Sequence, residues 1–538
     1  MADHEGGTPG SCLTMAALFG GAGWGLVNSG EGLLVLGGYG CGLIALTLAA
    51  RGWRALSQAR VQRRLLETAQ VPSGVHGSAQ WAGEAEAKAA RMFERGGLLL
   101  GWNGRYLYHN GEAGHLVIAP PGAGKTTCFT IPNGLTYARG AVFTDPRGEV
   151  AAVIGRHRAR AMGHRVHYLN PHGVLGLPDS GFNPLSLLEP GPEIKDTTAL
   201  LAALLLPGHA RGNATAEFFL RAGRTLLAAG MLWMAAGRWQ GGSPLAQLNQ
   251  LLRQPSEEMK AMFAAMVAVD DMDGLLRRYG GEALMTLETA PRQFMGGLGM
   301  ALQATDIYDA NAPLGRSTAR GTFRPQDLKD GRTDLFVILP GRFVETQGAW
   351  TNLVMSVCME VVGRSEDSRR VTFFLEEFAN LGFMPGVRKA MAQYRAQGLQ
   401  VVIIAQGFDQ LRRIYGPEDV AEFISLVDVV QLFGVRDPQT LDLVAAWMGQ
   451  YTAKTFSQNM RAESAAQGGL GLGIGETGAP LMRKEMIRQM SGDAQILFYK
   501  NLPPLWARKV DYRHVPNLAR RAGANPYYRR RSPLKGVF

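Results

Sequence analysis

A glycine-rich segment near residue 120 has the residue types and spacing of a phosphate-binding loop. An apolar run at 115–119 precedes it and an apolar stretch follows, which is the strand, loop and helix order of a P-loop. Its glycines allow consecutive backbone N–H groups to face a polyphosphate. Lys125 would reach the β- and γ-phosphates, and the Thr126 hydroxyl would ligate Mg²⁺. The predicted nucleotide-binding residues are Pro121, Gly122, Ala123, Gly124, Lys125, Thr126 and Thr127.

One position departs from the G-x-x-x-x-G-K-[ST] pattern of such loops. Ala119 stands where the first glycine is expected, while the later elements of the pattern are intact. Alanine is the smallest replacement for glycine. The alternative is an ordinary glycine-rich turn that happens to contain Lys-Thr, and the strand before the loop argues against it.

A pair of carboxylates ends another apolar run, at 372–375. One carboxylate of such a pair can support Mg²⁺, and the next can polarise the attacking water. We assign Glu376 to the metal and Glu377 to the water. The alternative is a helix start, where acidic residues are favoured. Asp145 also ends an apolar run and competes for the metal, but no second carboxylate stands beside it.

Two further polar residues are candidates for the same chemistry. Gln406 follows the apolar run 401–405, where an amide could sense the γ-phosphate or orient water. Arg395 lies just before that run. An arginine from a neighbouring subunit can stabilise the transition state of phosphoryl transfer, which requires an oligomeric ring. A structural role is the alternative for each residue.

Short apolar runs alternate with helical patterns along much of the chain. This alternation predicts an α/β domain with a largely parallel sheet, whose ligand sites lie at the carboxyl ends of the strands. From about 185 to 315 the strand signal gives way to helical spacing, which predicts an inserted all-α domain. The expected strands are Leu116–Ala119, Ala141–Thr144, Val166–Leu169, Leu335–Leu339, Val371–Leu375, Val401–Ala405, Val429–Phe433 and Ile496–Tyr499.

The N-terminal region has the composition of a membrane anchor. Residues 11–50 contain a single ionised side chain, Glu31. The stretch fits a hairpin of two transmembrane helices, about Cys12–Val27 and Leu33–Ala50. Arginines follow directly after residue 50, so the positive-inside rule places the rest of the chain in the cytoplasm. A single span followed by a buried apolar segment is the alternative.

Charge and cysteine content narrow the class of protein further. The 538 residues carry a formal net charge of +11, which suits nucleic acid, anionic lipid or a cytoplasm-facing membrane protein. Four scattered cysteines without C-x-x-C spacing argue against a zinc site or a disulfide framework. From Asn501 onward, nine basic residues face one acidic residue. The arginines and tyrosines after residue 516 favour either a solvated or lipid-associated basic tail or nonspecific strand binding.

We therefore divide the chain into five parts. These are a transmembrane anchor (1–50), a basic juxtamembrane linker (51–75), a nucleotide-binding motor domain (76–184 and 316–515), an inserted all-α domain (185–315) and a basic C-terminal tail (516–538). The length suits about two to four domains.

The chain resembles the TraG-type coupling proteins of bacterial type IV secretion and conjugation systems. The resemblance extends from about His76 to about Asp511, and the order and spacing of its motifs are specific. These motifs are Ala119–Thr126, Ile131–Asn133, Thr144–Glu149, Phe182–Leu185, Glu376–Gly382, Ala405-Gln406, Gln410-Leu411 and Tyr415-Gly416. Members of this family usually have Asp-Glu where this chain has Glu376-Glu377.

The resemblance implies a hexameric ATPase with a RecA-like P-loop NTPase domain, anchored in the bacterial inner membrane with most of the chain cytoplasmic. It implies ATP and Mg²⁺ as cofactors. The implied partners are single- or double-stranded DNA, a relaxase or protein effector, and the components of a type IV secretion channel. The expected function is to couple relaxase-bound DNA to that channel and to drive export by ATP hydrolysis.

Two other functions fit parts of the sequence. The first is a substrate-receptor platform that binds ATP and recruits protein effectors with little autonomous hydrolysis, and the Glu376 departure favours it. The second is a DNA translocase of the chromosome-segregation type, which has the same motor chemistry. The two compact predicted spans and the family motifs argue against this second function.

Overall fold

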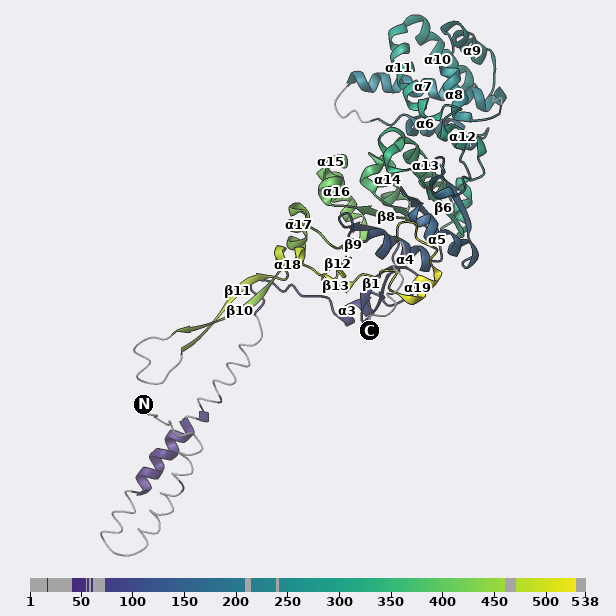
Figure 1. Ribbon diagram of the computed structural model, residues 1–538. Coiled ribbons are helices and arrows are strands. Elements are labelled where there is room, and N and C mark those ends of the chain that lie inside the picture. Colours follow the sequence, from purple (N-terminus) through teal and green to yellow (C-terminus); the bar gives the residue numbers. More distant parts are fainter. Residues whose placement is uncertain are drawn as a thin grey trace, which may run out of the picture. The chain divides into compact units, whose positions relative to one another are not determined.

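The computed structural model describes residues 73–208, 214–238, 241–459 and 471–528, together with 17, 41–54, 56–57 and 60. The chain forms two compact units. The larger contains Gln80–Met448 and Met482–Phe538, and the smaller contains Met1–Ala79 and Gly449–Leu481. Figure 1 shows the elements of both units.

The predicted transmembrane hairpin falls largely on residues that the structure does not describe. Of the first span, Cys12–Val27, only residue 17 is described, and of the second, Leu33–Ala50, residues 41–50 are described and are helical. No helix among the described residues combines the length and the apolar character that a bilayer span needs.

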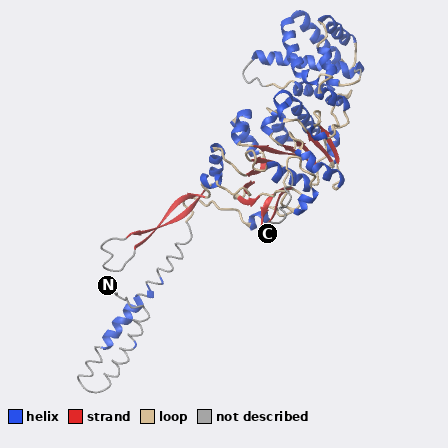
Figure 2. Ribbon diagram, in the orientation of Figure 1, coloured by secondary structure: helices blue, strands red, loops and turns tan. Residues whose placement is uncertain are grey.

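A sheet of eleven strands forms the centre of the larger unit, and helices flank it (Figure 2). Seven adjacent strands are parallel, and four antiparallel strands extend one edge. All eight predicted strands are present. In sheet order the strands are β2 (Arg105–His109), β1 (Leu98–Asn103), β13 (Leu505–Arg508), β12 (Ala494–Tyr499), β9 (Val427–Leu432), β3 (Gly114–Ile118), β8 (Leu399–Ala405), β7 (Val371–Leu375), β4 (Gly140–Thr144), β6 (Thr333–Val337) and β5 (Arg165–Leu169).

The order of the central strands determines which loops can meet. β8 lies between β3 and β7, and all three run in the same direction. Because β3, β4, β7 and β8 are buried along their whole length, their side chains contribute to the core on both faces, as expected for parallel strands covered by helices. The loops after these four strands therefore emerge at one edge of the sheet, the usual place for a ligand site.

The helices beside the sheet come from several parts of the chain. They are α3 (Glu84–Ala89), α4 (Ile131–Thr136), α5 (Glu149–Arg160), α13 (Val344–Arg364), α14 (Pro385–Gln393), α15 (Phe408–Tyr415), α16 (Pro417–Ser425), α17 (Pro438–Met448), α18 (Lys484–Arg488) and α19 (Pro516–Arg521).

A group of helices is inserted between β5 and β6, and the described residues between those two strands contain no strand. The helices are α6 (Ile194–Leu205), α7 (Ala214–Trp233), α8 (Pro244–Leu252), α9 (Ser256–Ala268), α10 (Leu275–Thr289), α11 (Pro291–Thr305) and α12 (Pro313–Arg320). Glycines allow α7 and α11 to approach closely. A Cβ atom on Gly297 would lie 2.7 Å from the Cβ of Ala222.

The smaller unit contains a hairpin that the sequence did not reveal. β10 (Gln450–Asn459) pairs with β11 (Gly471–Pro480), and Ser78 bridges to Tyr451 beside it. The sequence pattern does not predict this hairpin, because β11 is rich in glycine and glycine is depleted in strands.

A buried ion pair connects helix α5 with strand β6. The Arg158 guanidinium on α5 donates to Asp334 on β6, with an Nη2 to Oδ1 distance of 2.7 Å, and both side chains are fully buried. Arg158 also donates to the carbonyls of Gly134 and Tyr137, at 3.0 and 2.8 Å. His164 lies 2.9 Å from Asp334. The guanidinium thus links α5 to β6 and to α4 and the residue that follows it.

Replacing Arg158 with methionine is expected to destabilise the larger unit strongly. The change leaves Asp334 buried without its cationic partner, which typically costs about 3–5 kcal/mol. The measurement is the midpoint of thermal unfolding of the full-length chain. Arg156→Met, at an exposed position of the same helix, is the matched control and should change the midpoint little. Equal midpoints for the two variants would contradict the assignment.

Candidate functional site

The glycine-rich loop follows β3 and turns sharply into a helix. Gly122 and Gly124 have φ values of 76° and 94°, a region that side-chain-bearing residues rarely adopt. The loop then enters a π-helical turn, Thr126–Thr130, which continues into α4. The predicted order of strand, loop and helix is therefore present, although the first helical turn is wider than an α-helix.

Ala119 is compatible with this loop. Its backbone N–H donates to the carbonyl of Ala405 on β8 at 3.0 Å, so it continues the strand pairing. Its φ is not positive, in contrast to those of Gly122 and Gly124. A glycine is therefore not required at this position.

Lys125 lies at the centre of the site. Its side chain is 6% exposed, and its ammonium donates to the carbonyl of Ala119 at 2.9 Å. The same nitrogen is 3.6 Å from Oε1 of Glu377. The structure thus brings together the P-loop lysine, which follows β3, and the second predicted carboxylate, which follows β7, although β8 separates these two strands.

Glu376 is buried against the helix that follows the loop. Thr126 and Thr130 both donate their hydroxyls to its carboxylate, Thr126 at 3.2 Å. Thr144, at the end of β4, donates to its backbone carbonyl at 3.0 Å. The longer side chain of glutamate thus reaches two threonines on the P-loop helix. Burial raises the pKa of Glu376 to about 7, assisted by the charges of Glu377 and Asp145 and opposed by the Thr130 hydrogen bond.

Glu377 adopts an unusual backbone conformation. Its φ of 50° and ψ of 43° are left-handed, which is rare for a side-chain-bearing residue and costs of order 1–3 kcal/mol. The turn places its carboxylate beside Gln406, whose Nε2 donates to Oε2 at 2.8 Å. Glu377, Gln406 and Lys125 therefore form one connected group at the ends of three adjacent strands.

Asp145, the competing candidate for the metal, has a different set of contacts. Its Oδ2 accepts the backbone N–H of Ala151 at 2.8 Å, which stabilises the first turn of α5. Burial raises the pKa of Asp145 to about 7, opposed by that hydrogen bond and assisted by the charge of Glu149. Its carboxylate is thus engaged by α5, whereas that of Glu376 contacts Thr126 directly.

A cleft of about 480 Å³ lies at this site, and the residues that line it include Pro121, Gly122, Gly124, Lys125, Thr126, Thr127, Asp145, Glu376 and Glu377. Within the described part of the chain, no group of three or more histidines, cysteines or acidic residues could hold a metal unaided. The donor set of Thr126 and Glu376 nevertheless fits Mg²⁺, which takes hard oxygen ligands and usually completes its shell with phosphates and waters.

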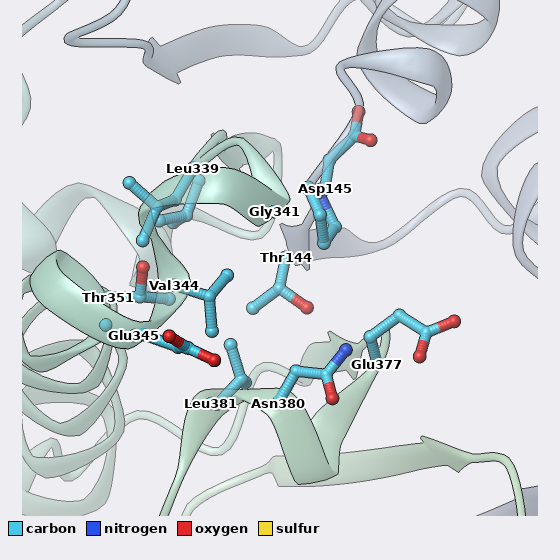
Figure 3. Close-up of a pocket in the computed structure, with 13 residues that line it drawn as sticks. Thr144, Asp145, Leu339, Gly341, Val344, Glu345, Thr351, Glu377, Asn380 and Leu381 are labelled. Atoms are coloured by element: carbon cyan, nitrogen blue, oxygen red, sulfur yellow. The ribbon is translucent and has the colours of Figure 1, made fainter.

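A second pocket, of about 300 Å³, lies next to this cleft and shares Asp145 and Glu377 with it. Figure 3 shows that the carboxylates of both residues point away from the centre of this second pocket, while Thr144, Val344 and Leu381 surround it. The carboxylates of Asp145 and Glu377 therefore do not face the centre of this second pocket.

Arg395 lies elsewhere in the same unit. It precedes the first residue of β8, whereas Gln406 follows the last, so the two occupy opposite ends of that strand. Its guanidinium is about half exposed and is 3.7 Å from Glu112. The structure therefore does not bring Arg395 into the site of its own chain, and its role in a neighbouring site stays a prediction.

The C-terminal segment contributes residues that the sequence reasoning did not place in the site. A basic tail was expected from residue 516, but α19 and the residues up to Tyr528 pack on the larger unit, while 529–538 lie outside the described residues. The physical reason is apolar burial, because Leu518 enters the core of the unit. Arg513 and Tyr528 of this segment line the cleft, together with Arg147 just before α5. No local pattern links Tyr528 to a loop that lies some 400 positions earlier.

Comparison with solved structures identifies proteins of the same fold. The unbound bacterial conjugative coupling protein TrwBdeltaN70 is similar with a TM-score of 0.60 at 16% identity, over 82% of this chain and 96% of that one. The plasmid coupling protein TrwB in complex with ADP and Mg²⁺ has a TM-score of 0.58 at 16% identity, over 80% and 94%. The α/β fold with a mostly parallel sheet that the sequence predicted is confirmed, and these coupling proteins have a similar fold.

Comparison with curated sequences identifies VirD4 and TraG proteins as relatives. Protein VirD4 of Agrobacterium fabrum is 28% identical over 457 residues, which cover 81% of this chain and 66% of that protein. The conjugal transfer protein TraG of Rhizobium radiobacter is 27% identical over 430 residues, covering 77% and 64%. The chain thus spans slightly less than two thirds of the length of these relatives.

A sequence model of one family matches residues 80–529, which include the phosphate loop, the acidic pair and the inserted helices. That family is described as type IV secretory system conjugative DNA transfer. The match covers most of the chain, and it agrees with the motifs that resemble TraG-type coupling proteins. The chain therefore belongs to the type IV secretory system conjugative DNA transfer family.

Proposed function

We propose that this protein is a Mg²⁺-dependent ATPase that couples DNA substrates to a type IV secretion channel and drives their export. The observation that carries the proposal is the group formed by Lys125, Glu377 and Gln406, next to a buried Glu376 that contacts Thr126. Nucleotide hydrolysis requires a loop that binds phosphate, oxygen ligands that support a metal ion and a carboxylate that orients the attacking water, and this group combines all three.

The phosphate end of ATP would be held by the loop. The backbone N–H groups from Gly122 to Thr127 face the β-phosphate, and Lys125 neutralises the charge of the β- and γ-phosphates. Thr126 and Glu376 would hold Mg²⁺, which supplies charge neutralisation between the phosphate oxygens. TrwB, a protein of the same fold, was solved in complex with ADP and Mg²⁺, which supports binding of a nucleotide and Mg²⁺ by this chain.

The attack of water on the γ-phosphate depends on Glu377. Its carboxylate accepts a hydrogen bond from Gln406 and lies near Lys125, so its position is restrained from two sides. A carboxylate held in this way can orient a water molecule and accept its proton. Gln406 is then a positioning residue for Glu377 as well as a candidate sensor of the γ-phosphate.

The substrate and the channel are inferred from the family and from charge. The family description names conjugative DNA transfer, and the formal charge of +11 suits a phosphate backbone. Binding of single- or double-stranded DNA is expected to be largely nonspecific and to weaken with salt. A relaxase attached to the DNA, or a protein effector, would be the accompanying cargo.

The setting of this activity is a ring at the bacterial inner membrane. The apolar N-terminal region would anchor the protein as a multi-pass hairpin, with most of the chain in the cytoplasm. A homo-oligomer, expected to be a hexamer, would allow Arg395 of one subunit to reach the nucleotide of the next. Its half-exposed guanidinium is compatible with such a role.

ATP hydrolysis by the full-length chain, with and without DNA, tests the function. Hydrolysis is expected to rise with DNA and to vanish in Lys125→Ala, because the phosphates lose their cation. Glu377→Gln should keep nucleotide binding and lower the turnover rate by about 10²–10⁴-fold, the typical contribution of a general base. The measurement is phosphate release together with calorimetric ADP affinity.

A matched control is Lys88→Ala, at an exposed position of α3, which should leave hydrolysis unchanged. Tight ATP binding without turnover under any DNA condition would contradict the motor function. That result would instead favour the receptor platform that recruits protein effectors.

Metal-dependent nucleotide binding is expected to strengthen as the pH rises from about 6 to about 8. The pKa of Glu376 is raised to about 7, so its carboxyl is mostly protonated below that pH and ionised above it. Only the ionised form binds Mg²⁺ well, so affinity should rise by up to about tenfold per unit below the pKa. The measurement is Mg²⁺ dependence of ADP affinity by calorimetry.

The phosphates of ADP also titrate, but they do so equally for the wild type and for every variant. Comparing the variants therefore isolates the contribution of Glu376 to the pH dependence. Glu376→Gln should remove its part of the pH dependence, and Asp145→Asn, which changes the other buried carboxyl with a pKa of about 7, should keep it. A pH profile that survives in Glu376→Gln and disappears in Asp145→Asn would assign the metal to Asp145 instead.

A further inference from the structure

The C-terminal segment is fastened beside the phosphate loop by hydrogen bonds at several points. The backbone N–H of Tyr512 donates to the carbonyl of Thr127 at 3.2 Å. Asn525 donates through Nδ2 to Glu149 at 2.8 Å and to the hydroxyl of Tyr512 at 3.0 Å. These contacts attach the segment to the helix after the loop and to the start of α5.

The end of this segment presents two tyrosine rings that arginines support. Tyr527 donates its hydroxyl to the carbonyl of Arg147 at 2.8 Å, and the Arg147 guanidinium lies 3.9 Å from the centre of the Tyr527 ring. The Arg513 guanidinium lies 4.7 Å from the centre of the Tyr528 ring. Arg513 is itself held by Asp511, with an Nε to Oδ1 distance of 2.9 Å.

Both tyrosine rings are partly exposed, and Tyr528 is the one of the two that lines the cleft. It is 46% exposed and lines the cleft together with Arg513, Lys125 and Thr126. Aromatic side chains of this size normally bury much of their surface, and a half-exposed ring that faces a binding cleft is available to a ligand. Its cationic neighbour Arg513 adds attraction for an electron-rich ring system.

The direction of a bound nucleotide follows from the positions of the phosphate-binding residues. Lys125 and Glu377 mark the γ-phosphate end, so the α-phosphate and the nucleoside must leave the loop away from Glu377. The backbone contact between Thr127 and Tyr512 places the C-terminal segment beside the turn that follows Thr126. Arg513 and Tyr528 therefore line the part of the cleft in which the nucleoside is expected.

We infer that Tyr528, supported by Arg513, is the platform on which the base of the nucleotide stacks. The inference rests on the proposed function, because it assigns a residue to the nucleoside end of the same site. Stacking on an aromatic ring uses the face of the base and tolerates differences at its edges. The site is therefore expected to accept adenine and guanine nucleotides with similar affinity.

The test compares a ligand that has a base with one that has none. Calorimetry on the full-length chain with Mg²⁺ measures binding of ADP and of inorganic tripolyphosphate. Tyr528→Ala is expected to weaken ADP binding about fivefold, the low end of stacking contributions, and to leave tripolyphosphate binding unchanged. Tyr528→Phe, which keeps the ring and removes only the hydroxyl, is the matched control and should retain ADP affinity.

Three results would overturn the inference. If ADP binds Tyr528→Ala as tightly as the wild type, while Lys125→Ala abolishes binding, the base lies elsewhere although the proposed function stands. If Tyr528→Ala weakens tripolyphosphate as much as ADP, the residue supports the phosphate loop and not the base. If the wild type binds neither ligand, the proposed function fails and the platform fails with it.

Discussion

The burial of the Glu376 carboxylate against the P-loop helix is the interaction on which the site depends. Thr126 and Thr130 hold this carboxylate, and Thr144 holds its backbone, so one residue connects the ends of β7 and β4 with the helix after β3. A buried carboxylate is costly unless hydrogen bonds or cations compensate it. Here the hydroxyls supply part of that compensation, and burial still raises the pKa of Glu376 to about 7. A divalent cation beside Thr126 would add to the compensation.

The sheet order makes this arrangement possible. One strand, β8, separates the loop strand from the strand of the acidic pair, and the loop after β8 contributes Gln406 between them. Parallel strands place all these loops at the same edge. The Arg158 and Asp334 pair holds α5 against β6, and α5 in turn begins beside Asp145. Stability and site geometry therefore share the same elements.

Much of the sheet could be predicted from the sequence, because fully buried parallel strands appear as continuous apolar runs bounded by turns. The loop and the acidic pair could be predicted because their chemistry demands particular residues at particular spacing. The hairpin β10–β11 was not predicted, because the glycine-rich sequence of β11 lacks the pattern of a strand. Tyr528 was assigned to a tail because its contacts with the site are made across the fold and not along the chain. The role of Arg395 stays a prediction, because its guanidinium lies near Glu112 and not in the site of its own chain.

The most direct measurement is Mn²⁺ binding to the full-length chain, detected by electron paramagnetic resonance with and without ADP. Mn²⁺ takes the same oxygen ligands as Mg²⁺. Thr126 and Glu376 alone offer too few donors, so about one Mn²⁺ per chain should bind with ADP present and little without it. Thr126→Ala and Glu376→Gln should each weaken that binding. The contrary result is that, with ADP present, the wild type and both variants bind Mn²⁺ with equal affinity. That result would contradict the assignment of the metal to Glu376 and Thr126.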